Sequence, residues 1–149
     1  GTNGATFYIT GAQFETGSTA TSFDYRPYST ELSLCQRYYE KSYPQDTVPG
    51  TATGLGAFIS GGTVAGTTTS FVGAPTPKFV VEKRAVPTVT VYDIAGASGV
   101  CQRWTLSINN TNGSAVAVVL QATTGFLFYS ASGANASGLQ LHFTASAEL

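Results

Sequence analysis

The stretch that decides the fold is residues 8–42, which read YITGAQFETGSTATSFDYRPYSTELSLCQRYYEKS. Residues 8–16 alternate in the manner of a β-strand, so that Tyr8 and Phe14 fall on the same side. Residues 17–28 are polar and contain glycine and proline, which favours an extended connector. We therefore expect residues 1–28 to be the end of a larger upstream region, joined without a linker to a helical segment.

This short helix is predicted over residues 30–40, within a helical segment 29–42. Ser29 and Thr30 are small hydroxyl residues that cap the first amides of helices, and an acid such as Glu31 is favoured near their positive end. One apolar stripe at helical spacing is formed by Leu32, Cys35 and Tyr39. Because so short a helix is unstable alone, we expect this stripe to need another surface to pack on.

The rest of the chain, residues 43–149, predicts a β-sandwich. Residues 43–53 contain two prolines and a glycine and indicate a loop. Short apolar runs then alternate with turn signals, as in antiparallel sandwiches of the jelly-roll kind. We expect strands at residues 55–60, 68–72, 78–83, 88–94, 103–109, 115–122, 125–131 and 139–145. Asn112-Gly113 suits the turn of a hairpin over residues 107–115, because both residues tolerate positive φ. The predicted fold class is all-β, with one short helix in front.

Strand periodicity also assigns faces. In the last strand the inward side carries Leu139, Leu141 and Phe143, which leaves Gln140, His142 and Thr144 outward. The same reasoning places Val89, Val91 and Trp104 inside. Residues 126–129 (FLFY) are apolar on both sides, which is typical of a strand buried twice, within one subunit or between subunits.

Composition excludes several functions. The net charge of −1 offers no basic stripe for nucleic acid, and no apolar run approaches the ~18 residues of a membrane span. With one histidine and two cysteines there is no metal-binding pattern, and no cofactor is expected. We expect Cys35 and Cys101 to be free, buried thiols.

No sequence motif of a known catalytic site is present. The acids that a glycosidase pair would need include Asp24, Glu31, Glu40 and Asp46, which lie in the predicted cap, helix and loop. Solvated or capping roles are the simpler interpretation of such residues. We therefore expect the protein not to be an enzyme.

The run GAQFETGSTATSFDYRPYSTELSLCQRYYEKS resembles a junction found in bacteriophage tail-fibre and tail-spike proteins. There a G-x-Q-[LF]-E-x-G strand precedes T-x-F-[DE]-x-R-x-Y and then E-L-x-L-C-Q-R-Y-Y. Two later landmarks agree with this pattern, KRAVPTVT at residues 83–90 and AEL at residues 147–149. The resemblance covers the first third of the chain closely and the remainder through those landmarks.

The resemblance implies a homotrimeric virion component, joined to upstream tail-fibre segments, whose C-terminal domain contacts the host cell surface. Carbohydrate binding is the expected activity. Two alternatives remain open: a structural fibre tip or head fibre without a ligand site, and a depolymerase that cleaves the glycan it binds. Subunit contacts are expected at Leu32, Cys35, Tyr39, Phe126 and Phe128.

Candidate glycan-binding residues are outward side chains that combine an aromatic face with polar groups, since sugar rings present both apolar C–H bonds and hydroxyls. They are Tyr92, Arg103 and His142, with Tyr129 if its face is free. The alternative is that these are ordinary residues of a strand face, since scattered exposed aromatic side chains are common. The glycine-rich segments 93–99 and 132–138 are expected to form the rim of such a site. Residues 50–69, rich in glycine and threonine, are the next place to look.

Overall fold

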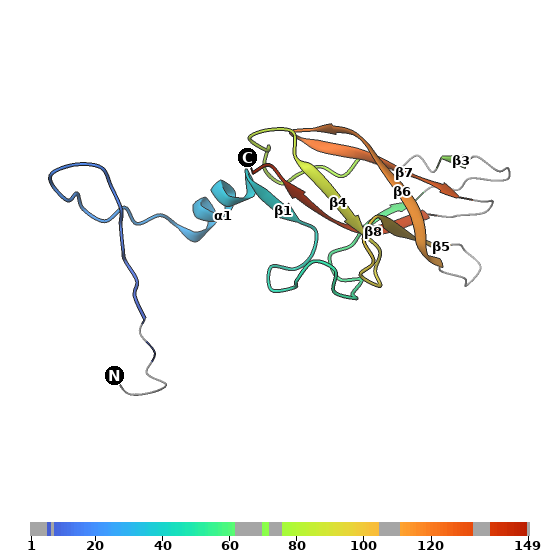
Figure 1. The fold of residues 1–149 in the computed structure, drawn as a ribbon, viewed down its shortest axis with the longest axis horizontal. Coiled ribbons are helices and arrows are strands. Elements are labelled where there is room, and N and C mark those ends of the chain that lie inside the picture. The colour runs from blue at the N-terminus through green and yellow to red at the C-terminus, as the bar shows by residue number, and fades with distance from the viewer. Residues whose placement is uncertain are drawn as a thin grey trace.

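A computed structural model describes residues 6, 8–61, 70–71, 76–104, 111–132 and 138–148. One helix, α1 (Tyr28–Gln36), is followed by a β-body (Figure 1). Its strands are β1 (Tyr39–Lys41), β2 (Phe58–Gly61), β3 (Ser70–Phe71), β4 (Thr88–Tyr92), β5 (Val100–Trp104), β6 (Thr111–Ala122), β7 (Gly125–Ser132) and β8 (Gly138–Ser146).

Strand β8 is the centre of the sheet. Its first half lies between β2 and β5, and its second half lies between β1 and β4, with antiparallel pairing throughout. The sheet continues from β5 through β6 and β7 to β3. The long strand β6 pairs with β5 at its start and with β7 at its end, so the sheet curls around a single core. The all-β architecture with one short helix is confirmed.

The core lies inside this curl. It contains Phe79, Val91, Cys101, Phe126, Phe128, Leu139, Leu141, Phe143 and Ala145. The inward assignments of Val91 and of the alternate residues in β8 are confirmed, and Val89 packs against this cluster. The predicted double burial of residues 126–129 is confirmed only in part, because Leu127 and Tyr129 are half-buried. Since Phe126 and Phe128 are each 1% exposed within one chain, they are not available as subunit contacts.

Several predicted boundaries are wrong. Residues 78–83 form no strand, apart from a single bridge between Lys78 and Gly125. Asn112-Gly113 lies inside β6, so it does not form the predicted hairpin turn. The strand predicted at 103–109 begins at Val100, because Gly99, at a φ of 76°, precedes it. The side chain of Trp104, residues 105–110 and residues 133–137 lie outside the described residues.

Helix α1 is shorter than predicted and is capped differently. It begins after Pro27, and no side chain caps it, although Glu31 lies in its first turn as expected. The chain turns after Gln36, and Tyr39 belongs to β1 rather than to the helix. None of the helical residues is fully buried, although Leu32 is half-buried, and Cys35 is an exposed free thiol. The prediction that both cysteines are buried holds for Cys101 alone.

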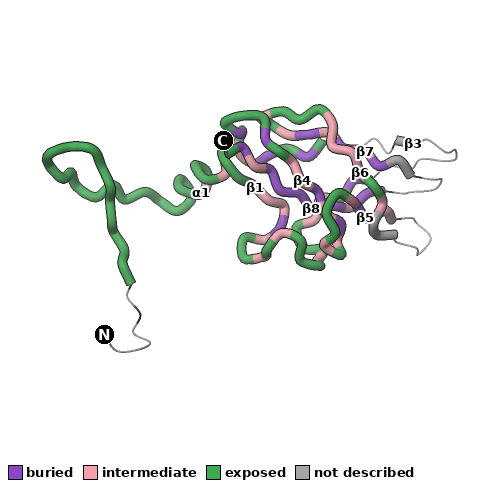
Figure 2. Tube along the Cα trace, viewed as in Figure 1, coloured by how far each residue is buried: buried purple, intermediate pink, exposed green. Residues whose placement is uncertain are grey.

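Residues 8–27 form an arm that extends away from the β-body (Figures 1 and 2). The predicted strand at residues 8–16 is not formed, because its backbone has no strand partner in the described part of the chain. Polar side chains nevertheless fold the arm into a loop: the Glu15 carboxylate accepts bonds from the amide and hydroxyl of Thr21, and the Gln13 amide oxygen accepts the Asp24 N–H. The aromatic side chains of the arm remain exposed.

The prediction that the side chains of His142 and Thr144 face solvent is wrong, because both residues are buried, with exposed fractions of 0% and 9%. Strand β8 has strands on both edges, and the segment between β1 and β2 covers part of its second face. Alternation reports which residues share a face, but whether that face is covered depends on the segments that fold over it.

A buried ion pair joins the first elements to the body. Lys83 Nζ lies 2.6 Å from Glu40 Oε2, and the two side chains are 0% and 6% exposed. Lys83 also donates to the carbonyls of Gln36 and Val81, and its ammonium lies 4.8 Å from the centre of the Phe79 ring. Since every ammonium proton has an acceptor, the charge is tolerated in the interior. The pair fixes α1 and β1 to the segment before β4.

We predict that Lys83→Met lowers the free energy of unfolding by about 3–5 kcal/mol, because it leaves the Glu40 carboxylate buried without its cation. Chemical denaturation measures the loss. The matched control is Lys78→Met, an exposed lysine in the same segment, for which a change within about 0.5 kcal/mol is expected. The double variant Glu40→Leu/Lys83→Met should recover most of the loss; equal effects of Lys83→Met and Lys78→Met would refute the structural role.

Candidate functional site

The outer face of β1, β8 and β4 carries an aromatic and polar surface. Register places Tyr39 opposite Ser146, Lys41 opposite Thr144, and Tyr92 opposite His142. Thr88 and Thr90 share this face, because they pair with Ser146 and Thr144. We use the name outer face for these residues together with Tyr43, that is, for Tyr39, Lys41, Tyr43, Thr88, Thr90, Tyr92, His142, Thr144 and Ser146.

Three rings are packed together at one end of the outer face. Tyr43 stacks on His142, with ring centroids 3.8 Å apart and planes inclined by 11°. The Tyr92 ring meets Tyr43 edge-on at 6.0 Å. Tyr43 and His142 are buried, whereas Tyr92 is half-buried and Tyr39 is 40% exposed. Tyr39 and Tyr92 therefore present the accessible aromatic surface, and the stacked pair supports it from below.

The two accessible tyrosines are close enough to influence one another. The pKa of the Tyr39 hydroxyl is raised, first by burial and then by the Tyr92 hydroxyl. Tyr92 also contributes to the raised pKa of Tyr43, although burial is the main cause there. Three phenol groups thus share one region of the outer face.

His142 is held by both ring nitrogens. Its Nε2 lies 2.9 Å from the Thr53 carbonyl, which only accepts, so Nε2 carries the proton and Nδ1 accepts the Ser42 hydroxyl at 3.0 Å. The Ser42 oxygen in turn accepts the Phe143 N–H. Although serine and histidine are adjacent, both imidazole nitrogens and the serine oxygen already have partners. The arrangement is that of a satisfied buried histidine rather than of an activated nucleophile.

The segment between β1 and β2 is fixed over this end of the face. The Gly50 N–H donates to the Tyr43 hydroxyl. A Cβ at Gly96 would overlap with the Gly50 carbonyl, so this close approach of two loops requires glycine. The turn that contains Gly96 is held by Asp93, whose Oδ1 accepts the N–H groups of Ala95 and Ala97. A rigid rim therefore borders Tyr92.

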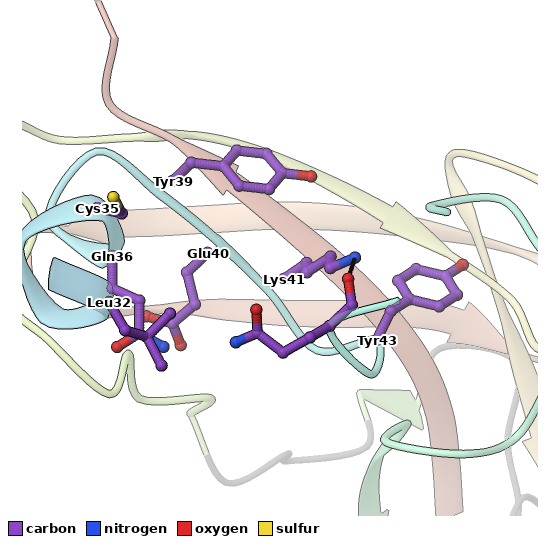
Figure 3. A pocket seen from close by; sticks show the side chains of 8 residues that line it. Leu32, Cys35, Gln36, Tyr39, Glu40, Lys41 and Tyr43 are labelled. Atoms are coloured by element: carbon purple, nitrogen blue, oxygen red, sulfur yellow. Dashed lines mark hydrogen bonds between the residues drawn. The ribbon is translucent and has the colours of Figure 1, made fainter. Parts of the chain in front are cut away.

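A hollow of about 180 Å³ lies beside β1 (Figure 3). Helix α1 provides Leu32, Cys35 and Gln36, and β1 with the residues after it provides the rest: Tyr39, Glu40, Lys41, Tyr43 and Gln45. In Figure 3 the Tyr39 ring points along the strand in the direction of Tyr43. Lys41 Nζ donates to the carbonyls of Gln45 and Thr47, which anchors the chain after β1.

The structure brings together two of the four predicted glycan-binding residues. Tyr92 and His142 are cross-strand neighbours, but His142 is buried and supports the face instead of contacting solvent. Arg103 lies on β5, where its Nε donates to Ser114 Oγ at 2.8 Å, and Tyr129 lies on β7 opposite Ala117. Of the two rim segments, 93–99 borders Tyr92 as expected, whereas residues 133–137 lie outside the described residues.

Sequence reasoning missed Tyr39, Lys41 and Tyr43 as members of this surface, because it places Tyr39 in the helix and Tyr43 in a loop. A signal is present in the sequence, since Tyr39, Lys41 and Tyr43 alternate with Glu40 and Ser42 as in a strand. The helical spacing of Leu32, Cys35 and Tyr39 competes with it.

The described residues contain no group of histidine, cysteine or acidic side chains able to hold a metal ion. Among them, no helix is long and apolar enough to cross a membrane. Glu40, one of the four acids weighed as catalytic, is engaged by Lys83, and Asp24 and Glu31 both contact Arg26.

Comparison with known proteins gave no match: no protein-family model, no curated protein and no solved structure is similar to this chain.

The stability of the fold is predicted to depend on pH through His142. Burial lowers the pKa of His142, and the bond to the Thr53 carbonyl opposes this only in part. Because the unfolded chain takes up a proton near pH 6.5 and the folded chain does so only at lower pH, stability is complete above about 6.5 and falls as the pH drops below it.

Urea denaturation between pH 7.5 and pH 5.5 measures this loss. His142 is the one histidine of the chain, so His142→Gln should remove the dependence in this window. A wild-type stability that is flat from pH 7.5 to 5.5 would contradict the assignment of a buried, neutral imidazole.

Proposed function

We propose that this protein is the distal domain of a bacteriophage tail fibre, and that it binds a host cell-surface carbohydrate on its outer face. The observation that carries the proposal is that the Tyr39 and Tyr92 rings lie on one face of the sheet together with hydroxyl groups and an ammonium group. The resemblance of residues 11–42 to the junction of tail-fibre proteins supplies the biological context.

The outer face has the chemistry that sugar recognition requires. Tyrosine rings offer apolar surface to the C–H groups of a pyranose, and their hydroxyls serve as donors and acceptors. Thr88 and Thr90 provide further hydroxyls, at exposed and half-buried positions of β4. The stacked Tyr43 and His142 restrict movement of Tyr92, which reduces the entropy lost when a ligand is bound.

The alternative of a structural tip is favoured by a different observation. Tyr43 and His142 are fully engaged within the chain, so the same cluster also serves as an internal support for the end of the sheet. A measurement of carbohydrate binding distinguishes the two functions, because a structural tip has no carbohydrate ligand. A depolymerase is disfavoured by the engagement of Glu40 with Lys83.

We further propose that the domain acts as a homotrimer in the virion. The arm and α1 carry exposed aromatic and apolar side chains that one chain leaves uncovered: Tyr8, Ile9, Phe14, Phe23, Tyr25, Tyr28 and Leu34. So extensive an apolar surface is typical of a subunit contact. Leu32, Cys35 and Tyr39 line the hollow beside β1 and remain candidates for this contact, whereas Phe126 and Phe128 do not.

For the carbohydrate site, we predict that Tyr92→Ala weakens binding of the purified domain to its glycan by at least about tenfold, or about 1.4 kcal/mol. A glycan array identifies the ligand, and titration of that ligand measures the change. Tyr129→Ala is the matched control, a half-buried tyrosine on β7 away from the outer face. Loss of binding in Tyr129→Ala but not in Tyr92→Ala would place the site elsewhere.

For assembly, we predict a trimer at micromolar concentration, because the exposed side chains of the arm and α1 are buried on association. Light scattering coupled to size exclusion gives the mass directly. A monomer under these conditions would contradict the proposed assembly. It would not affect the proposed carbohydrate site, which the Tyr92→Ala variant tests separately.

A further inference from the structure

We propose that residues 8–16 of one chain pair, as an added β-strand, with the free edge of β1 in a second copy of the chain. The inference deepens the proposed function, because it rests on the self-association stated there and names the surfaces that meet. Two complementary observations on the described residues support it: a segment with strand-like alternation that pairs with no described strand, and an edge of β1 that no described strand occupies.

The unpaired segment is the start of the arm. Its alternation is that of a strand, yet the structure leaves Tyr8 and Phe14 exposed at 88% and 101%. Residues 8–16 make no backbone contact with another strand in the described part of the chain. Backbone amides and carbonyls without a strand partner in an alternating segment that carries exposed aromatic side chains favour addition to an existing sheet.

The available edge is that of β1. Among the described strands β1 pairs only with β8. Ser42 N–H donates to the Phe143 carbonyl and Ala147 N–H donates to the Tyr38 carbonyl, so residues 38, 40 and 42 direct their backbone groups to β8. By the alternation of antiparallel ladders, the backbone groups of Tyr39 and Lys41 point away from β8, where a further strand would bind.

The surroundings of this edge suit an apolar strand with an acidic flank. The hollow between α1 and β1 offers Leu32 and Tyr39 to an incoming side chain. The arm and first helical turn, residues 8–31, contain three acids and one arginine, a net charge of −2. Arg37, Lys41 and Arg84 lie in or beside β1, since the Arg84 N–H donates to the Arg37 carbonyl. Two exposed acids lie nearby: Glu82 accepts a bond from the Thr123 hydroxyl, and Asp46 accepts one from the Thr47 hydroxyl.

The second copy, and not the same chain, is the occupant that the geometry favours. The arm leaves the body at α1 and extends away from it, so that its first residues lie far from β1 of their own chain (Figure 1). The Glu15 bonds to Thr21 and the Gln13 bond to Asp24 hold the arm in this folded loop. In a closed assembly each copy would donate one strand and accept one, so that the β1 edge of every copy is paired.

The native thiol of Cys35 provides the test, because it is exposed and lines the hollow, whereas Cys101 is buried. Two differently tagged chains are co-expressed. One carries Gly11→Cys with Cys35→Ser, and the other keeps Cys35 and has no cysteine in the arm. Mild oxidation and then non-reducing electrophoresis should give a cross-linked pair that contains both tags. The control replaces Gly11→Cys by Thr19→Cys at the far end of the arm loop, and it should give no such pair.

A companion chain carrying Gly11→Cys and retaining Cys35 tests the intramolecular route, in which a disulfide would form within a single chain. A disulfide between the cysteine introduced by Gly11→Cys and Cys35 of the same chain would overturn the proposal. A trimer that gives no cross-link would overturn the strand pairing and leave the proposed assembly intact. A monomer would overturn both, while carbohydrate binding is measured separately.

A second variant addresses the backbone directly. Thr10→Pro removes an N–H from the arm, which pairs with no strand in the part of the chain that the structure describes. The thermal unfolding of the separated chains should therefore not change. Association should weaken at least about tenfold, measured by dilution in analytical ultracentrifugation. The matched control is Thr19→Pro, in the same arm but outside the predicted strand. Equal association of Thr10→Pro and the wild-type chain would contradict strand pairing.

Discussion

The central position of β8 is the constraint on which the rest of the fold depends. Neighbouring strands pair with it along its whole length. The core covers one of its faces, and the Tyr43 ring and the segment that contains Thr53 cover part of the other. A polar residue such as His142 is tolerated there only because each of its nitrogens has a partner. The outer face exists because β8 holds β1 along one edge and β4 along the other.

The ion pair of Lys83 with Glu40 connects this sheet to the arm. It fixes β1 and the end of α1 against the segment that leads into β4, and so determines where the arm leaves the body. A buried ion pair contributes little net stability compared with apolar packing, but it tolerates only one geometry. In this protein its consequence is positional: it holds the free edge of β1 and the hollow beside it in a defined place for an incoming strand.

The two proposed activities use different parts of the same strand. Carbohydrate binding would use side chains of β1 and β4 on the outer face, whereas assembly would use the backbone edge of β1. Tyr39 contributes to both, since its ring lies on the face and also lines the hollow. Occupation of the edge by a second copy would therefore restrict the Tyr39 ring, and binding and assembly would be thermodynamically coupled.

The sequence by itself determined the all-β class, the short helix and the inward side of β8, because these depend on local periodicity. It did not determine where α1 ends, since Tyr39 satisfies both helical and strand spacing, and only the pairing with Ser146 selects the strand. Nor did it show that the outward side of β8 is covered. That depends on Tyr43, a residue distant in sequence whose ring lies over His142. Periodicity is a property of neighbouring residues, whereas burial and edge exposure are properties of the segments that the chain brings together from afar.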